Sequence, residues 1–209
     1  MSPHAAQWQE ALRALEFMLG WRGGWMPLRF ERPGRSALFW HHCGVPGSGR
    51  ILERLVHDCD LQHSDQVELL LPEPKRFNGG PCGASALWCR IEGRDQLDRA
   101  RRFRPLPSVV LQEGTSSRRL LLWGLREWLN YFNVEKANRR IAYRLRATQK
   151  HGVPENLRVP APGTFLRAGR ARPTPVVVRR CEPVLFGVDQ VAGRLKDPPP
   201  QRMPWEAAA

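Results

Sequence analysis

The chain has 209 residues, enough for one domain with a full hydrophobic core, and its 33 Lys and Arg against 20 Asp and Glu give a formal net charge of +13. This charge favours polyanionic partners, nucleic acid first among them. The five cysteines show no regular spacing, no apolar run approaches a membrane span and no signal peptide opens the chain, so we expect a cytoplasmic protein without disulfides or a membrane partner.

The N-terminal third predicts helices and strands in alternation. Apolar residues recur at helical spacing near the start, and Pro33-Gly34 separates two short apolar runs as in a hairpin. The expected elements are a helix over 5–19, hairpin strands over 27–32 and 36–42, a helix over 50–57 and a strand over 66–71.

The remainder predicts a β-α-β unit followed by a strand, a long helix and shorter strands. The expected elements are strands over 84–92 and 108–112 around a helix over 96–103, a strand over 118–125, a helix over 134–150, and strands over 156–160, 174–180 and 184–188. We therefore predict an α/β (α+β) fold in one domain over 1–196, with 197–209 as a disordered proline-rich tail.

Sequence blocks between Phe77 and Arg180 occur in a recognisable order. The first reads Leu-Trp-Cys-Arg-Ile-Glu over 87–92, and the second places Pro-Ser before Val-Val over 103–110. Gly114 and a Leu-Leu-Leu-Trp strand over 120–123 come next, and a segment over 157–165 contains Pro-Gly-Thr. The succession is more specific than any single block.

This succession resembles the primase–polymerase domains of plasmid and phage replication proteins, RepB-like primases of the archaeo-eukaryotic primase superfamily. The resemblance implies a primase–polymerase-like fold with a mixed central sheet flanked by helices. Residues 77–196 carry it, and residues 1–76 form the N-terminal part of the same domain.

The resemblance also shows which catalytic groups are altered. An Asp-x-Asp pair on the first strand of the family holds divalent ions for nucleotidyl transfer; the matching positions here are Arg90 and Glu92. The family's histidine falls near Leu120, and no carboxylate stands at 148–150, where the third acid is expected. Glu92 is thus the retained acid of the motif, and we expect weak or absent catalysis, with Mg²⁺ or Mn²⁺ required if the protein is active.

Basic residues on the predicted 134–150 helix and beyond it have few acidic neighbours, which is typical of a surface that follows phosphates without reading sequence. The resemblance implies that they line a groove for template and primer. The predicted nucleic-acid-binding residues are Arg118, Arg119, Arg139, Arg140, Arg144, Lys150, Arg158, Arg167, Arg170 and Arg172.

A histidine and cysteine group in the N-terminal part could in principle hold zinc. Its members are His41, His42, Cys43, His57, Cys59 and His63. They match no standard zinc spacing, so we predict no metal site there and no resident cofactor.

The leading functional hypothesis is a nucleic-acid-binding primase–polymerase-like protein of a plasmid, phage or other mobile element, acting in replication with little or no catalysis. The second is an active primase that uses rearranged carboxylates such as Glu92, Glu113 and Glu155. The third is a non-catalytic subunit that recruits a helicase or polymerase. Single-stranded or primer-template DNA is the expected ligand, and the sequence leaves RNA open.

Overall fold

Two β-sheets and the helices between and beneath them form the protein. The computed structural model describes residues 3–20, 25–32, 35–43, 50, 66–71, 73–74, 81–113, 117–147, 157–160, 165–166 and 174–198. Its helices are α1 (Pro3–Gly20), α3 (Arg94–Arg102), α4 (Tyr131–Leu145) and the short π-helix η1 (Asp189–Gly193). None of the described helices is both long enough and apolar enough to cross a membrane.

The smaller sheet has four strands in the order β2-β1-β3-β8. They are β1 (Trp25–Arg32), β2 (Arg35–His42), β3 (Gln66–Leu71) and β8 (Leu157–Pro160). All its pairings are antiparallel, and β1 and β2 form the hairpin that the sequence predicts across Pro33-Gly34.

The larger sheet has seven strands, in the order β4-β5-β7-β6-β10-β9, with β11 beside β7. They are β4 (Glu73–Pro74), β5 (Pro81–Ile91), β6 (Val109–Glu113), β7 (Arg119–Asn130), β9 (Phe165–Leu166), β10 (Thr174–Cys181) and β11 (Leu185–Phe186). Because β5 and β6 are each antiparallel to β7, they run parallel to one another, as the predicted β-α-β unit requires. The predicted mixed sheet is confirmed.

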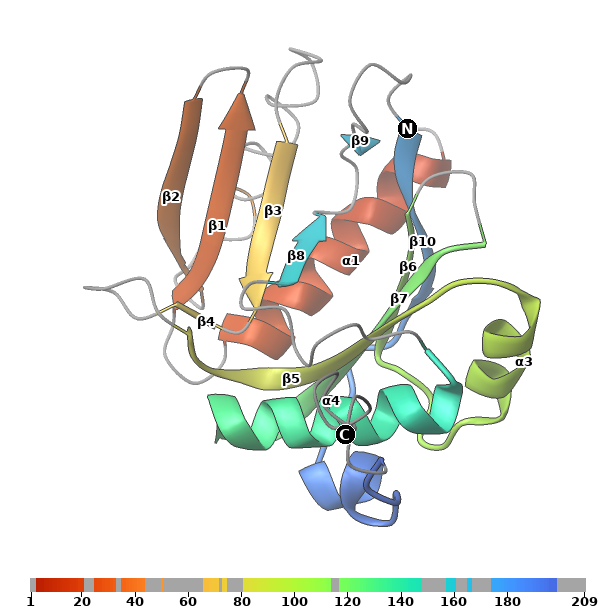
Figure 1. Cartoon of the computed structure of the whole chain (residues 1–209). Coiled ribbons are helices and arrows are strands. Elements are labelled where there is room, and N and C mark those ends of the chain that lie inside the picture. The colour runs from red at the N-terminus through yellow and green to blue at the C-terminus, as the bar shows by residue number, and fades with distance from the viewer. Residues whose placement is uncertain are drawn as a thin grey trace, which may run out of the picture.

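The larger sheet is covered on both faces, which explains the unbroken apolar run of β7. On one face, a Cβ added to Gly124 would lie 2.9 Å from the Met18 side chain of α1, so the helix and strand approach closely there. On the other face, the Trp123 ring packs 5.3 Å from that of Phe103, which follows α3. Figure 1 shows α1 above β5 and β7 and α4 below them.

The long helix is shorter at its end than the sequence predicts. Asn130 caps its start by accepting a hydrogen bond from the Asn133 amide (3.0 Å). At the other end Arg146 adopts a left-handed conformation (φ 55°), which terminates α4 at Leu145 and not at 150. The predicted inward positions Ala137, Ile141 and Leu145 are buried, because they follow the 3.6-residue period.

Other predicted elements agree in position and differ in length. The strand predicted over 118–125 continues to Asn130, because β7 pairs with β5 a second time at Leu129 and Asn130. The strand predicted over 184–188 shortens to β11, and η1, which follows, was not predicted. The helix predicted over 50–57 lies outside the described residues after Arg50, and so does the tail after residue 198.

Candidate nucleic-acid interface

The strand β5 carries the first block of the resemblance, and its register fixes which side chains share a face. Arg90 lies opposite Leu120 of β7, which lies opposite Leu111 of β6. Side chains two residues apart on a strand point the same way. Arg90, Arg118 and Glu113 therefore lie on one face, the face that α1 covers elsewhere.

Glu113 forms the centre of this group. Its side chain is 4% exposed. Arg90 donates from Nε to Glu113 Oε2 (2.8 Å) and from Nη2 to Oε1 (2.5 Å), the bidentate geometry that suits a guanidinium and a carboxylate. Arg118 Nε lies 2.9 Å from Oε2 of the same carboxylate. One buried carboxylate thus holds two partly exposed guanidinium groups, and both of its oxygens are engaged.

This arrangement does not fit a catalytic divalent ion. Such an ion needs several carboxylate oxygens directed at one point. Here the guanidinium of Arg90, which the resemblance aligns with the first acid position, engages both oxygens of Glu113. Glu92, which the resemblance gives as the retained acid, is exposed just beyond the end of β5, where its backbone amide donates to Gln96 Oε1 (2.7 Å). Among the described residues, the groups around Arg90 therefore do not form a site for a divalent ion.

A second pair of arginines lies at the same end of the sheet, on its other face. Arg119 is opposite Gln112 in the register, and Arg179 of β10 donates from Nε to Gln112 Oε1 (2.7 Å). Burial, and then the like charge of Arg179, lower the pKa of Arg119. An anion bound beside Arg119 and Arg179 would reduce the electrostatic repulsion between their two positive charges.

We call the group at this end of the sheet, where β6 leads to β7, the turn-end cluster. Its members are Arg90, Glu113, Arg118, Arg119 and Arg179. Among the described residues, Arg90 and Arg118 share the Glu113 carboxylate on one face of the sheet, and Arg119 and Arg179 lie on the other face, a positive excess that suits phosphate.

The predicted arginines of α4 lie elsewhere. The inner side of α4 is buried, so its basic residues point away from the sheet. Arg139 Nη2 lies 2.5 Å from Glu135 Oε1, and Arg140 donates to both carboxylate oxygens of Asp197 (2.6 and 3.1 Å). The pKa of Asp197 is lowered by its hydrogen bond to Arg140. The two arginines are thus paired with acids on the surface.

Arg144 lines a pocket of about 460 Å³ on the same side of the molecule. The other lining residues are Arg99, Tyr143, Arg146, Arg194, Leu195 and Lys196. We call this side the helix face and define it by these pocket residues together with Arg139 and Arg140. The face is basic, although Arg99 is itself paired with Asp95 (3.0 Å).

The predicted binding residues that the structure describes therefore lie in separate regions of the molecule and not along one groove. Arg118 and Arg119 lie at the turn end, whereas Arg139, Arg140 and Arg144 lie on the helix face. Arg158 is on β8 of the smaller sheet. Lys150, Arg167, Arg170, Arg172 and the acid Glu155 lie outside the described residues.

Two residues of the turn-end cluster are not predicted as binding residues by the sequence. The sequence suggests Glu113 only as a metal ligand, and it does not single out Arg179. The missing information was strand order, since β10 lies beside β6 although 60 or so residues separate them. The alternation of Leu111 and Glu113 was the available signal, because it puts the carboxylate on the same face as Leu111.

Of the six histidine and cysteine residues considered as zinc ligands, His41 and Cys43 are buried and His42 is exposed. His57, Cys59 and His63 lie outside the described residues. His41 and Cys43 lie close to Glu16 of α1, a residue that the sequence did not bring into this group.

The sheet order, the β-α-β unit and the helices on both faces define a primase–polymerase-like fold. Two solved structures share it: the AEP domain of the cyanophage S-2L primase-polymerase (PrimPol) and the primase RepB′. The first matches with a TM-score of 0.58 and 11% identity over 90% of this chain and 97% of that one. The second matches with a TM-score of 0.58 and 10% identity over 90% of this chain and 59% of that one.

No family model matches the sequence, and no curated protein does. The resemblance drawn from the sequence blocks is thus confirmed by the fold. At this identity the likeness establishes the architecture alone, and function has to be argued from this chain's own residues.

Proposed function

We propose that the protein is a nucleic-acid-binding, primase–polymerase-like component of replication or priming in a plasmid, phage or other mobile element. It acts in the cytoplasm with little or no nucleotidyl transfer. The proposal is supported chiefly by one observation: Arg90, which the resemblance aligns with the first acid position of the motif, binds Glu113 through two hydrogen bonds.

Binding is supported by the charge balance of the turn-end cluster. Guanidinium groups bind phosphate oxygens bidentately and stay charged at any physiological pH. Glu113 uses its charge to hold Arg90 and Arg118 in place, so the outward parts of these partly exposed side chains are pre-oriented. Arg119 and Arg179 extend the cationic surface across the end of the sheet. A strand of DNA that crosses this end would have its phosphates neutralised without a metal ion.

The helix face is proposed as a weaker, second contact. Its α4 arginines Arg139 and Arg140 are already paired with Glu135 and Asp197, and a phosphate has to compete with these carboxylates. Arg144 and the pocket beside it are the part of this face that best suits a phosphate. Lys150, Arg158, Arg167, Arg170 and Arg172 remain proposed contacts from the sequence.

A primer synthesis and extension assay with Mg²⁺ or Mn²⁺ tests the catalytic half of the proposal. The full chain is expected to bind single-stranded and primer-template DNA and to give no product above background. Glu92→Ala should leave that background unchanged. Robust synthesis that Glu92→Ala abolishes would contradict the proposal and favour an active primase with rearranged carboxylates.

The binding half is tested by fluorescence anisotropy with labelled DNA at several salt concentrations. Affinity that falls steeply with salt supports a phosphate-binding surface. Weak affinity that salt leaves unchanged would contradict it and favour the interaction subunit that recruits a helicase or polymerase. Matched RNA oligonucleotides in the same titration determine which nucleic acid binds more tightly.

A further inference from the structure

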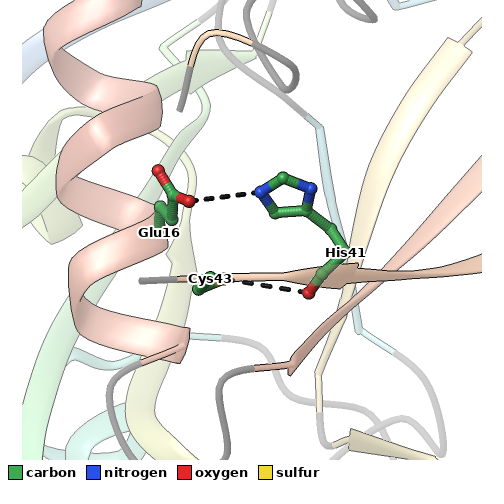
Figure 2. A group of neighbouring side chains, drawn as sticks. All are labelled: Glu16, His41 and Cys43. Carbon is green, nitrogen blue, oxygen red and sulfur yellow. Dashed lines mark hydrogen bonds and ion pairs between the residues drawn. The ribbon is translucent and has the colours of Figure 1, made fainter. Parts of the chain in front are cut away.

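A buried group of three possible metal ligands lies where α1 meets the smaller sheet. Glu16 lies on α1, His41 near the end of β2, and Cys43 one residue beyond that strand. Figure 2 shows the Glu16 carboxylate and the His41 ring pointing toward one another, with Cys43 beside them. The group lies apart from the turn-end cluster and is independent of the proposed function.

The local chain geometry explains why these side chains meet. Cys43 lies in the turn after β2, where its thiol donates to the carbonyl oxygen of His41 (3.9 Å), so the two residues stay close together. Glu16 lies among Leu12, Leu15 and Met18 on the apolar side of α1. An acidic residue at a core-facing position of an amphipathic helix needs a polar partner.

The distances are close to those of a zinc site. His41 Nε2 lies 3.2 Å from Glu16 Oε1, and all three ligand atoms lie within 4.8 Å of one another. Zinc bonds of about 2.0–2.3 Å in tetrahedral geometry separate neighbouring ligand atoms by roughly 3.3–3.6 Å. The distance between His41 Nε2 and Glu16 Oε1 is already close to this spacing, and the Cys43 sulfur has to move closer to them by at most about 1.5 Å.

The three side chains are largely shielded from solvent, unlike polar side chains that meet by chance on a surface. His41 and Cys43 are 8% and 5% exposed, and the Glu16 side chain is 12% exposed. Imidazole, thiolate and carboxylate together suit Zn²⁺, whereas Mg²⁺ and Ca²⁺ prefer oxygen alone. A water molecule would complete four-coordination.

We propose that Glu16, His41 and Cys43 bind one Zn²⁺ ion that joins α1 to β2. The helix α1 also contacts β5, β6, β7 and β10 of the larger sheet. An ion at this point would connect the smaller sheet to the helix that covers the larger one. Its role is structural, since no residue of the turn-end cluster takes part.

Zinc content of the full chain is the first test. After incubation with Zn²⁺ and desalting, elemental analysis is expected to find about one ion per chain. Cys43→Ser and His41→Ala should each lower zinc affinity by more than about tenfold, as loss of a ligand requires. The matched controls are His42→Ala, an exposed neighbour, and Cys181→Ala, a cysteine of β10; both should keep the ion.

Cobalt substitution supplies a readout that does not depend on folding of a variant. Co²⁺ bound by the wild-type chain should give a thiolate-to-metal charge-transfer band. Burial raises the pKa of Cys89 to about 12 and that of Cys181 to about 11, so a metal ion would displace the proton of either thiol at a greater cost than that of an ordinary cysteine. Glu16→Gln should weaken the site while leaving the band.

The outcomes separate the proposal from its alternative. A wild-type chain that binds no Zn²⁺ and gives no cobalt band would contain a hydrogen-bonded His41–Glu16 pair only, and the proposal would be wrong. Zinc retained undiminished in folded Cys43→Ser and His41→Ala would also overturn it. Far-UV circular dichroism establishes that each variant is folded.

Discussion

The two arginine-rich regions of this protein differ in what their guanidinium groups contact. On the helix face, Arg139 and Arg140 each pair with an acid at the surface, so much of the charge is balanced locally. At the turn end, Arg90 and Arg118 share one buried carboxylate while Arg119 and Arg179 repel one another. We therefore rest the proposed binding surface on the ratio of arginines to nearby carboxylates and not on the number of arginines alone.

The difference also concerns rigidity. Glu113, which is 4% exposed, holds two of the turn-end guanidinium groups, those of Arg90 and Arg118, whereas Asp197, on the helix face, is more than half exposed. Surface ion pairs contribute about 0–1 kcal/mol because water screens them and long side chains lose entropy. A guanidinium held by a buried partner loses less entropy when it binds phosphate.

The largest expected effect is on stability, from removal of the charge at the centre of the turn-end cluster. Glu113→Gln leaves Arg90 and Arg118 facing an amide, and we expect a loss of about 2 kcal/mol in the free energy of unfolding. Urea denaturation measures it. Glu135→Gln, which breaks a surface pair with Arg139, is the matched control and should cost about 0.5 kcal/mol or less. Equal losses would show that the two regions do not differ.

A smaller effect is expected on DNA affinity from the helix face. Arg139→Ala together with Arg140→Ala removes two positive charges that carboxylates already balance. Affinity for single-stranded DNA at low salt should fall by less than about threefold, the change expected from about 0.6 kcal/mol. Fluorescence anisotropy measures this affinity. A loss of affinity of tenfold or more would indicate that the main DNA-binding surface lies on α4.

The smallest effect concerns pH. The hydrogen bond from Arg140 holds the pKa of Asp197 below its ordinary value, so any stability from this pair is present above that value and is lost as pH falls through the lowered one. Acid unfolding curves of the wild type and Asp197→Asn should therefore converge at the acid end and differ only slightly near neutral pH. A large difference near neutral pH would mean that the exposed pair matters more than its exposure suggests.

Much of the fold could be predicted from the sequence, because its elements repeat simple patterns. The hairpin across Pro33-Gly34, the buried strand β7 and the inner side of α4 all follow from apolar spacing and turn residues. The position at which α4 ends could not be predicted, because nothing in its apolar pattern marks Arg146 as the residue that adopts a left-handed backbone conformation.

The candidate site could be predicted only in part. Alternation on β5 predicts that Arg90 and Glu92 share a face, and the assignment of Arg90 to the first acid position remains a prediction from the resemblance. The pairing of Arg90 with Glu113, the contribution of Arg179 and the approach of Glu16 to His41 depend on strand order and helix packing. Such long-range contacts leave no local pattern in the sequence.

The salt dependence of DNA binding in the presence of EDTA tests the central claim most directly. EDTA removes divalent ions, so the remaining electrostatic contribution to affinity comes from the basic side chains. Each single-strand phosphate contact that is lost should reduce the slope of log affinity against log salt by about 0.7. We predict that Arg118→Ala with Arg119→Ala reduces the slope by about 1.4, whereas Arg139→Ala with Arg140→Ala leaves it nearly unchanged. A slope that is unaffected at the turn end, or binding that vanishes in EDTA, would contradict a metal-free phosphate site built on arginine.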